Sequence, residues 1–284
     1  MDFEDFELRT LDFKFKEGGR MMNIVVCVKR VPETSEADVS IDPSGKDIDK
    51  SGLAFDLNEW DSYAIEEAIR LKEKQGGTVM VLSVGGEESN ESLRKCLAMG
   101  ADDALRLNDP AFIGSDGLAT AKILAEAIRK IPYDLILTGA QAEDDGYGQV
   151  GVAVAEILGV PHASVVNRLE VQEKKAKVHR ELEGGLEEVY DIDLPALLTI
   201  QTGINEPRYV SIMGIRKVAK KEIKALGALD LNLKPDEVGL SGSSVRVEKV
   251  FFPLVGQGAQ MLEGSPEDVS LKILDLLKDK GGLA

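Results

Sequence analysis

The sequence contains few of the residues that build disulfide frameworks, metal centres and catalytic triads. Only two of its 284 residues are cysteines, Cys27 and Cys96, and only two are histidines, His162 and His179. The cysteines lack a CxxC spacing, so neither a disulfide framework nor a zinc site is expected, which is typical of the reducing cytoplasm. Isolated histidines do not form a metal cluster, and no Ser-His-Asp or Cys-His pattern is present. We therefore predict a cytoplasmic protein with no metal site and no catalytic residues of its own.

Long apolar runs and positive charge are also scarce. No run approaches the roughly 18 apolar residues of a membrane helix, so we expect no direct membrane insertion. The chain carries 34 Lys and Arg against 50 Asp and Glu, a formal net charge of −16, which argues against nucleic acid as a partner. Residues 1–20 lack the apolar core of a signal peptide. We predict that they are a disordered extension or a misassigned start.

Apolar strands and amphipathic helices alternate through the first half of the chain. The expected strands are residues 23–29, 78–84, 104–107 and 134–138. The expected helices are residues 64–71, a segment around 93–97, residues 118–128 and residues 149–159. Strands that are apolar throughout are typical of a parallel sheet covered on both faces. The alternation predicts an α/β fold with a doubly wound, mostly parallel, Rossmann-like sheet.

The pattern changes after Pro161. Four apolar segments follow without a helical pattern between them, at residues 165–172, 176–182, 186–192 and 194–200. They predict an antiparallel extension of the sheet, within one α/β domain at residues 21–206. Periodicity weakens over residues 207–284, where Ser265 and Pro266 begin a last helix with an apolar stripe. We expect this tail to be a docking loop and an arm that needs a covering surface, in this chain or on another subunit.

A ligand of a doubly wound sheet binds at the carboxyl ends of the strands. Three of these ends are unusual, at residues 29–34, 83–86 and 138–150. In the last one, Gly146 and Gly148 precede a helix, and a helix start with accessible N–H groups favours a phosphate. The adjacent acidic residues 143–145 are expected to cap the turn or reach ribose hydroxyls. This is neither a Walker A loop nor GxGxxG, so an ordinary glycine-rich turn explains the bare pattern about equally well.

Five motifs in the same order resemble the β subunit of electron transfer flavoproteins. They are Val26–Pro32, Leu57–Asp61 leading into Ala64–Ala68, Ala98–Asp102, Gly139–Ala142 with Asp144 and Gln149, and Asn205–Tyr209. The resemblance implies an adenine-nucleotide-binding type of Rossmann-like fold and a heterodimer with an α subunit. This chain would close over the FAD that the α subunit carries. It would also hold a second nucleotide of its own, FAD or AMP. Electrons would pass from flavin dehydrogenases to a quinone oxidoreductase or ferredoxin. This describes an electron carrier rather than a stand-alone enzyme.

The resemblance also assigns site residues. The adenosine site would be formed by Cys27, Asn58, Ser83, Val84, Gly85 and Gln141, with Asp144 close by. Main-chain amides at the helix start would hold the phosphate, at Gly148, Gln149 and Val150. The partner's flavin would face Thr34 and Trp60. The docking residues would be Asn205, Glu206, Pro207, Arg208, Tyr209 and Ile212.

The identity of the second nucleotide stays open in the sequence. Residues 31–34 resemble the electron-bifurcating branch, in which it is FAD, and Gly146 with Gly148 leaves backbone room for a diphosphate. The ring of Tyr147 counts against FAD, because it can fill the space of a second isoalloxazine. Our preference is FAD, as in the electron-bifurcating branch. The alternative function is a universal-stress-type adenine-nucleotide-binding sensor, but such domains are about half this size and lack the 205–209 motif.

Overall fold

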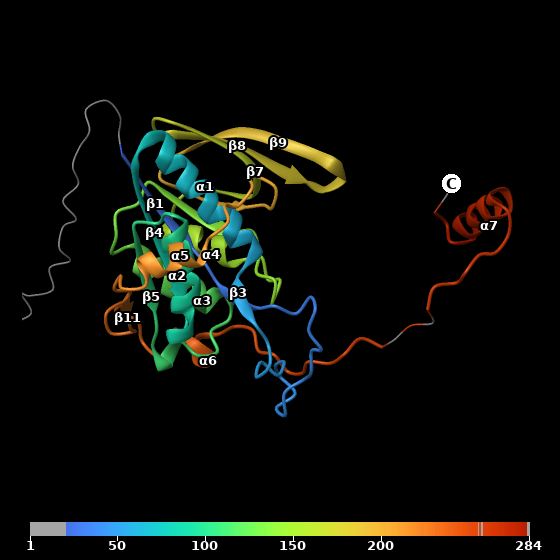
Figure 1. The fold of residues 1–284 in the computed structure, drawn as a ribbon, viewed down its shortest axis with the longest axis horizontal. Helices are drawn as coiled ribbons and strands as arrows, with labels where there is room; N and C mark the ends of the chain where they lie inside the picture. The colour runs from blue at the N-terminus through green and yellow to red at the C-terminus, as the bar shows by residue number, and fades with distance from the viewer. Residues whose placement is uncertain (1–20, 255, 257, 283–284) are drawn as a thin grey trace, which may run out of the picture.

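The computed structural model describes residues 21–254, 256 and 258–282, so the prediction for residues 1–20 lies outside the described residues. The strands are β1 (Met22–Cys27), β2 (Arg30–Pro32), β3 (Phe55–Leu57), β4 (Gly77–Val84), β5 (Asp103–Leu107), β6 (Leu135–Gly139), β7 (His162–Gln172), β8 (Lys175–Leu182), β9 (Leu186–Asp193), β10 (Ala196–Ile200) and β11 (Lys224–Leu226). The α-helices are α1 (Glu59–Gln75), α2 (Asn90–Met99), α3 (Gly117–Ile128), α4 (Val150–Leu158), α5 (Ile212–Val218), α6 (Gly239–Gly242) and α7 (Pro266–Asp279). Figure 1 shows an α/β body, with α7 standing apart at the end of an extended segment.

Nine of the described strands form one sheet in the order β11-β5-β4-β1-β6-β10-β7-β8-β9. The first strand, β1, is central and pairs in parallel with both β4 and β6. The chain therefore winds outward from β1 first in one direction and then in the other, which makes the β1 edge a topological switch point. The predicted doubly wound α/β fold is confirmed.

Both faces of the sheet are covered by helices, and alternate residues of β1 face opposite sides. Ile24 and Val26 belong to the apolar cluster formed with α1 and α2. Val25 and Cys27 belong to the cluster formed with α3 and α4. This burial on both sides explains why β1 is apolar at every position after Asn23.

The α1–β4 connection shows how closely the elements pack. Gly76 ends α1 as predicted, and Gly77 begins β4 with a φ of 119°. A Cβ atom on Gly77 would lie 2.0 Å from the carbonyl oxygen of Met22, so no other residue fits there without a backbone shift. At its other end α1 begins at Glu59, five residues before the predicted start at residue 64. The sequence pattern missed the first turn because its residues do not follow the apolar periodicity of the rest of the helix.

The prediction of an antiparallel extension is correct for β7, β8 and β9 but wrong for the last segment. β7 pairs with β8 and β8 with β9 in antiparallel register. β10 instead lies between β6 and β7 and is parallel to both. All five residues of β10 are buried, whereas β9 is mostly exposed, and full burial is typical of a central parallel strand.

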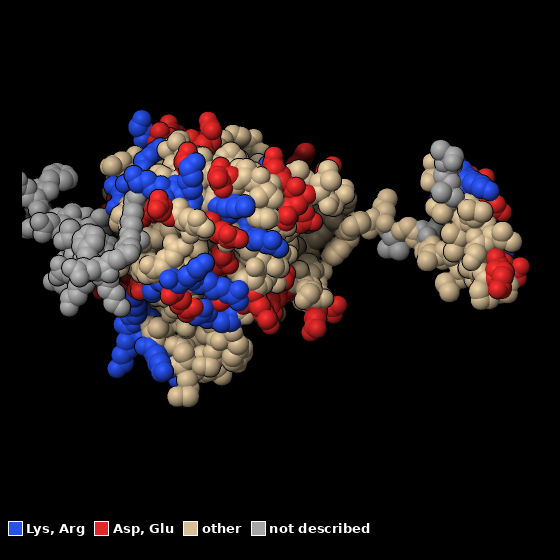
Figure 2. Space-filling model, turned by 90° about the horizontal axis from the view of Figure 1, so that it is seen from above, with Lys and Arg blue, Asp and Glu red and all other residues tan. Residues whose placement is uncertain are grey.

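Part of the tail after residue 207 is covered within this chain, which the sequence pattern did not predict. β11 adds to the sheet in parallel with β5, and Ala228, Leu231 and Val238 are buried in the cluster with α3 and α4. The part of the tail that is not covered begins near residue 250, since Phe251, Phe252 and other apolar residues of the extended segment between α6 and α7 are exposed. Residues 250–262 of this segment carry no charged side chain, and Figure 2 shows the segment leaving the charged α/β body. The last helix begins as predicted with a capping box at Ser265, and none of its described residues 266–279 is buried.

Candidate functional site

A pocket of about 350 Å³ opens at the carboxyl edge of the sheet. Its walls come from the residues that follow β1, β4 and β6, from the loop between β5 and α3, and from the first turn of α4. The volume lies in the lower part of the roughly 300–1,000 Å³ range of small-molecule pockets. The pocket thus occupies the switch point beside β1, where this class of fold binds ligands.

The pocket brings together most of the residues predicted to bind the nucleotide. Those lining it are Cys27, Asn58, Val84, Gly85, Gln141, Gly148, Gln149 and Val150. Ser83 lies just outside, buried in β4, and its Oγ has no hydrogen-bond partner among the described residues. Asp144 is also outside the lining, but its Oδ1 accepts a 2.6 Å hydrogen bond from Nζ of Lys29, which is in it.

Thr34 and Trp60, expected to face the partner's flavin, lie outside the pocket. Thr34 is in an exposed turn after β2. Trp60 is half-buried in the first turn of α1, where its Nε1 donates to Oε1 of Gln201 at 3.0 Å. Their contact with a flavin stays a prediction.

Asn58 shapes the pocket wall. It is only 1% exposed, its Nδ2 donates to the Gln141 carbonyl at 2.9 Å, and its Oδ1 accepts from the Glu143 N–H at 3.1 Å. Both ends of the amide are therefore engaged by the turn between β6 and α4. In this arrangement Asn58 fixes the main chain that closes the pocket.

Asp61 is a lining residue that the sequence interpretation did not single out. Its Oδ2 accepts from the Lys29 N–H at 2.7 Å and its Oδ1 from the Gly139 N–H at 3.0 Å, which ties together the ends of β1 and β6. Burial raises the pKa of this carboxyl to about 7, although the hydrogen bonds from Lys29 and Gly139 favour its ionised form. Its position was visible in the sequence, because it follows Asn58 by three residues in a motif already noted.

The start of α4 has the features of an anion site. Val150 and Gly151 line the pocket, and Gln149 at the N-cap makes no side-chain capping bond within the described structure. The first amides of a helix have no intrahelical acceptor and carry the positive end of its dipole. The turn before the helix contains Gly146 and Gly148 at φ values of 62° and 60°, which residues with a side chain rarely adopt. These features fit a bound phosphate.

The basic residues at the end of β1 are engaged by other side chains. Nζ of Lys29 pairs with Asp144 Oδ1 at 2.6 Å and with Asp145 Oδ2 at 2.8 Å. Arg30 lies over the Phe55 ring at 4.0 Å and pairs with Glu91 at 3.3 Å. Asp145 also caps the turn as expected, since its Oδ1 accepts from the Tyr147 N–H.

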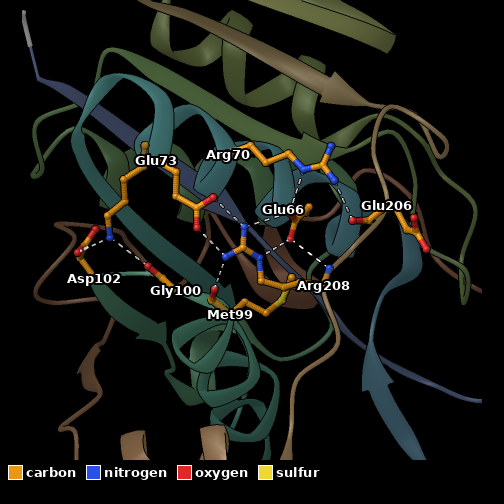
Figure 3. Close-up of polar contacts among 9 residues, drawn as sticks. Glu66, Arg70, Glu73, Met99, Gly100, Asp102, Glu206 and Arg208 are labelled. Carbon is orange, nitrogen blue, oxygen red and sulfur yellow. Dashed lines mark hydrogen bonds and ion pairs between the residues drawn. The ribbon is translucent and has the colours of Figure 1, made fainter.

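A second group of predicted residues is anchored on the middle and later turns of α1, and Figure 3 shows the contacts of Arg208 there. The Arg208 guanidinium is bidentate to Glu66, with distances of 2.8 and 3.1 Å, and also to Glu73, with distances of 2.8 and 3.2 Å. The Glu66 side chain is only 3% exposed and accepts a further bond from Nε of Arg70. Planar carboxylate pairs of this geometry are among the stronger polar contacts in proteins.

The neighbouring residues are anchored in the same way up to Arg208. Asn205 Nδ2 donates to the Tyr63 carbonyl and to Glu67, both at 3.0 Å, and the Glu206 carbonyl accepts from Arg70. Pro207, between Glu206 and Arg208, is half-buried. The side chains of Asn205 and Arg208 and the carbonyl of Glu206 are thus held within this chain, and a contact of these residues with a partner stays a prediction.

The chain then turns outward. Tyr209 is 90% exposed, and Ile212 and Met213 are 69% and 70% exposed. The Ser211 hydroxyl caps α5 by accepting from the Gly214 N–H at 3.1 Å, and the other end of α5 is held by Arg94, which donates to the Val218 carbonyl. We call Tyr209, Ile212 and Met213 the docking patch; it is an exposed apolar surface on a fixed support.

The described part of the chain contains no helix long and apolar enough to cross a membrane. It also contains no group of three His, Cys, Asp or Glu side chains arranged to hold a metal ion. Cys27 and Cys96 are buried free thiols, and burial raises the pKa of both.

Comparison with known proteins identifies the family. The electron transfer flavoprotein domain matches residues 47–231. The chain is 41% identical to the electron transfer flavoprotein subunit beta of Methylophilus methylotrophus over 265 residues, which cover 92% of this chain and 100% of the relative. It is 39% identical to the caffeyl-CoA reductase-Etf complex subunit CarD of Acetobacterium woodii, over 91% of this chain and 99% of the relative. It is 37% identical to protein FixA of Azotobacter vinelandii, over 87% of this chain and 90% of the relative. The chain therefore belongs to the family of electron transfer flavoprotein β subunits.

Proposed function

We propose that this chain pairs with an α subunit to form an electron transfer flavoprotein that carries electrons on FAD from flavin dehydrogenases to a quinone oxidoreductase or ferredoxin. The observation that carries the proposal is the pocket at the β1 edge, because residues from separate family motifs converge there. The match to family members along almost the whole chain supports it as well.

In this proposal the bound flavin supplies the redox chemistry and this chain supplies binding and orientation. The pocket would take the adenosine and first phosphate of a second nucleotide. The amides at the start of α4 would hold the phosphate, and Asn58 and Asp61 would keep the pocket walls in place. The buried Oγ of Ser83, which has no hydrogen-bond partner in the described part of the chain, is a further polar group suited to a ligand or a bound water.

We keep FAD as the expected second nucleotide, with AMP as the alternative. A pocket of about 350 Å³ suits the adenosine monophosphate part that both share. The flavin half of FAD would have to extend past Tyr147, which lines the pocket and is partly exposed. A role in bifurcation rests on this assignment. One relative is named as a subunit of a caffeyl-CoA reductase-Etf complex, so a larger assembly is part of the same proposal.

The test is to express the chain with its α subunit, denature the purified heterodimer and count the released nucleotides. Two FAD per heterodimer supports bifurcation, whereas one FAD and one AMP makes the protein a single-flavin carrier. No second nucleotide rejects the pocket. Gly148→Val should lower the content of the second nucleotide, because Gly148 combines a φ of 60° with a place in the pocket. Gly45→Val is the matched control, at a φ of 68° outside the pocket with no atom within 4 Å of its added Cβ.

We further propose that the docking patch contacts the donor dehydrogenase and that the tail after residue 250 packs on the α subunit. The tail supports this with exposed Phe251, Phe252 and Leu254 and with five exposed apolar residues on α7. Surfaces of this kind are interaction sites or aggregation liabilities. The domain limits at residues 21–206 and 207–284 and the location in the cytoplasm stay predictions.

A further inference from the structure

We propose that Lys29 determines the preference of the pocket for an anionic nucleotide, by neutralising Asp144 and Asp145 in the turn beside the phosphate site. This inference rests on the proposed function, in which the pocket binds an adenine nucleotide. It gives Lys29 a positioning role that differs from that of a direct phosphate ligand.

The charges that line the pocket are unfavourable for an anion. Among the described lining residues Lys29 is the only basic one, and Asp61, Asp109, Asp116 and Asp145 are acidic. A phosphate site with this lining needs each carboxylate to be compensated, because uncompensated charges of one sign repel a ligand of the same sign.

Three of these carboxylates are compensated by main-chain N–H groups. Asp61 accepts from Lys29 and Gly139. Asp109 accepts from the N–H groups of Ala111 and Ala228. Asp116 accepts from the N–H groups of Ala119, Ser244 and Val245. Their oxygens are therefore engaged by the walls of the pocket.

The charge of the remaining acidic pair, Asp144 and Asp145, is compensated by the ammonium group of Lys29. Asp144 and Asp145 lie in the turn between β6 and α4, and the Lys29 ammonium reaches them from the end of β1 at 2.6 and 2.8 Å. The second oxygen of Asp145 accepts from the Tyr147 N–H, so that carboxylate is held from two sides. The contacts connect residues 115 and 116 positions apart in sequence across the edge of the sheet.

The charge count shows why Lys29 matters for a phosphate. With Lys29 the cluster carries a net charge of −1, and without it −2, next to a helix start worth about half a positive charge. Burial tends to lower the pKa of Lys29, but its hydrogen bonds to Asp144 and Asp145 outweigh this and raise it, so the ammonium stays protonated. At an effective dielectric constant of about 20, one more uncompensated unit charge within about 12 Å of a phosphate changes affinity about tenfold or more.

The experiment measures AMP and adenosine binding by calorimetry to the heterodimer after removal of its second nucleotide. Adenosine shares the base and ribose of AMP but lacks the charge. Lys29→Met should weaken AMP about tenfold or more and change adenosine less than about threefold. Lys50→Met is the control, because Lys50 also pairs with an aspartate, at 2.7 Å, but in a loop outside the pocket.

Two further variants separate positioning from direct binding. Lys29→Met combined with Asp144→Asn and Asp145→Asn should recover AMP affinity, since the charges that Lys29 neutralises are then absent. If the triple variant stays as weak as Lys29→Met, Lys29 binds the phosphate directly and the inference is overturned. Equal weakening of AMP and adenosine by Lys29→Met overturns it too, because the lysine then acts only on pocket shape.

If Lys29→Met does not assemble with the α subunit, the double variant Asp144→Asn, Asp145→Asn keeps the inference testable. With Lys29 retained, the cluster changes from −1 to +1, so the ratio of AMP to adenosine affinity should rise by about a hundredfold. An unchanged ratio contradicts the inference. A wild-type heterodimer that binds neither AMP nor adenosine instead rejects the proposed pocket itself.

Discussion

Replacing Arg208 by methionine should destabilise the protein by about 2 kcal/mol at pH 7. Removing one partner of a buried ion pair costs about 3–5 kcal/mol, and the Glu66 side chain is 3% exposed. Two partners of Glu66 remain, the Arg70 side chain and the main-chain N–H of residue 208, so we expect roughly half of that cost. Glu73 is largely exposed and adds less than about 1 kcal/mol.

The effect of Arg208→Met should depend on pH. Burial raises the pKa of Glu66, but the bonds from Arg208 and Arg70 outweigh this and hold it below the ordinary value of 4.5. A carboxyl with a lowered pKa stabilises the fold above its unfolded pKa, and this contribution is lost as the pH falls through the folded pKa. The difference between wild type and Arg208→Met should therefore be full at pH 7 and shrink below about pH 4.5.

Denaturant unfolding of the heterodimer at pH 7 and pH 4 measures this difference. Arg216→Met is the matched control, because Arg216 is an exposed arginine of the nearby α5 and should change stability by less than about 0.5 kcal/mol. Hydrogen exchange at residues 209–213 should also accelerate in Arg208→Met, since the docking patch follows the lost anchor. An equal cost at both pH values, or an equal cost for Arg216→Met, would refute the role of the Glu66–Arg208 pair.

Three other predictions concern the patch, the pocket and the tail. Ile212→Ala should weaken transfer from the donor dehydrogenase by about 2 kcal/mol with an unchanged flavin spectrum, whereas lower thermal stability with unchanged donor affinity would mean that Ile212 packs within its own subunit. Because the pKa of Asp61 is raised to about 7, its carboxyl keeps a proton in the folded state that the unfolded state releases above pH 3.8. The contribution of Asp61 to the free energy of unfolding should therefore fall between pH 4 and 7, by up to about 1.4 kcal/mol per pH unit. Unfolding curves of wild type and Asp61→Ala from pH 5 to 8 check this, and parallel curves would contradict it. Expression without the α subunit should give an aggregation-prone protein with little FAD, and a well-behaved monomer with one tightly bound flavin would count against the proposed tail interface.

The parts of the fold predictable from the sequence are those in which burial is continuous and local. β1 is apolar because helices cover both of its faces, and this is visible without knowing which helices they are. The end of α1 at Gly76 and the start of α7 at Ser265 are set by short-range backbone and capping chemistry. These features follow from neighbouring residues, so a single sequence contains them.

The features that were missed depend on contacts between distant residues. The three residues of β11 are too few for a periodic pattern, and they form a strand only because β5 offers a free edge. β10 has the full burial of a central strand, but its parallel direction is decided by its insertion between β6 and β7. The role of Asp61 likewise depends on two N–H groups, at Lys29 and Gly139, that the sheet brings together. Composition alone does not show whether such an acid is solvated or buried.

The pocket and the docking patch are connected through one helix. The first turn of α1 and the residue before it supply Asp61 and Asn58 to the pocket, and its later turns supply Glu66 and Glu73 to Arg208. A substitution that displaces the whole helix would disturb both sites, so loss of nucleotide and loss of donor docking would then appear together. Arg208→Met acts on the later turns of α1, and Asp61→Ala acts on its first turn. If each variant changes only its own site, α1 serves as a rigid support whose two ends act independently; if each changes both, the helix couples nucleotide binding to docking.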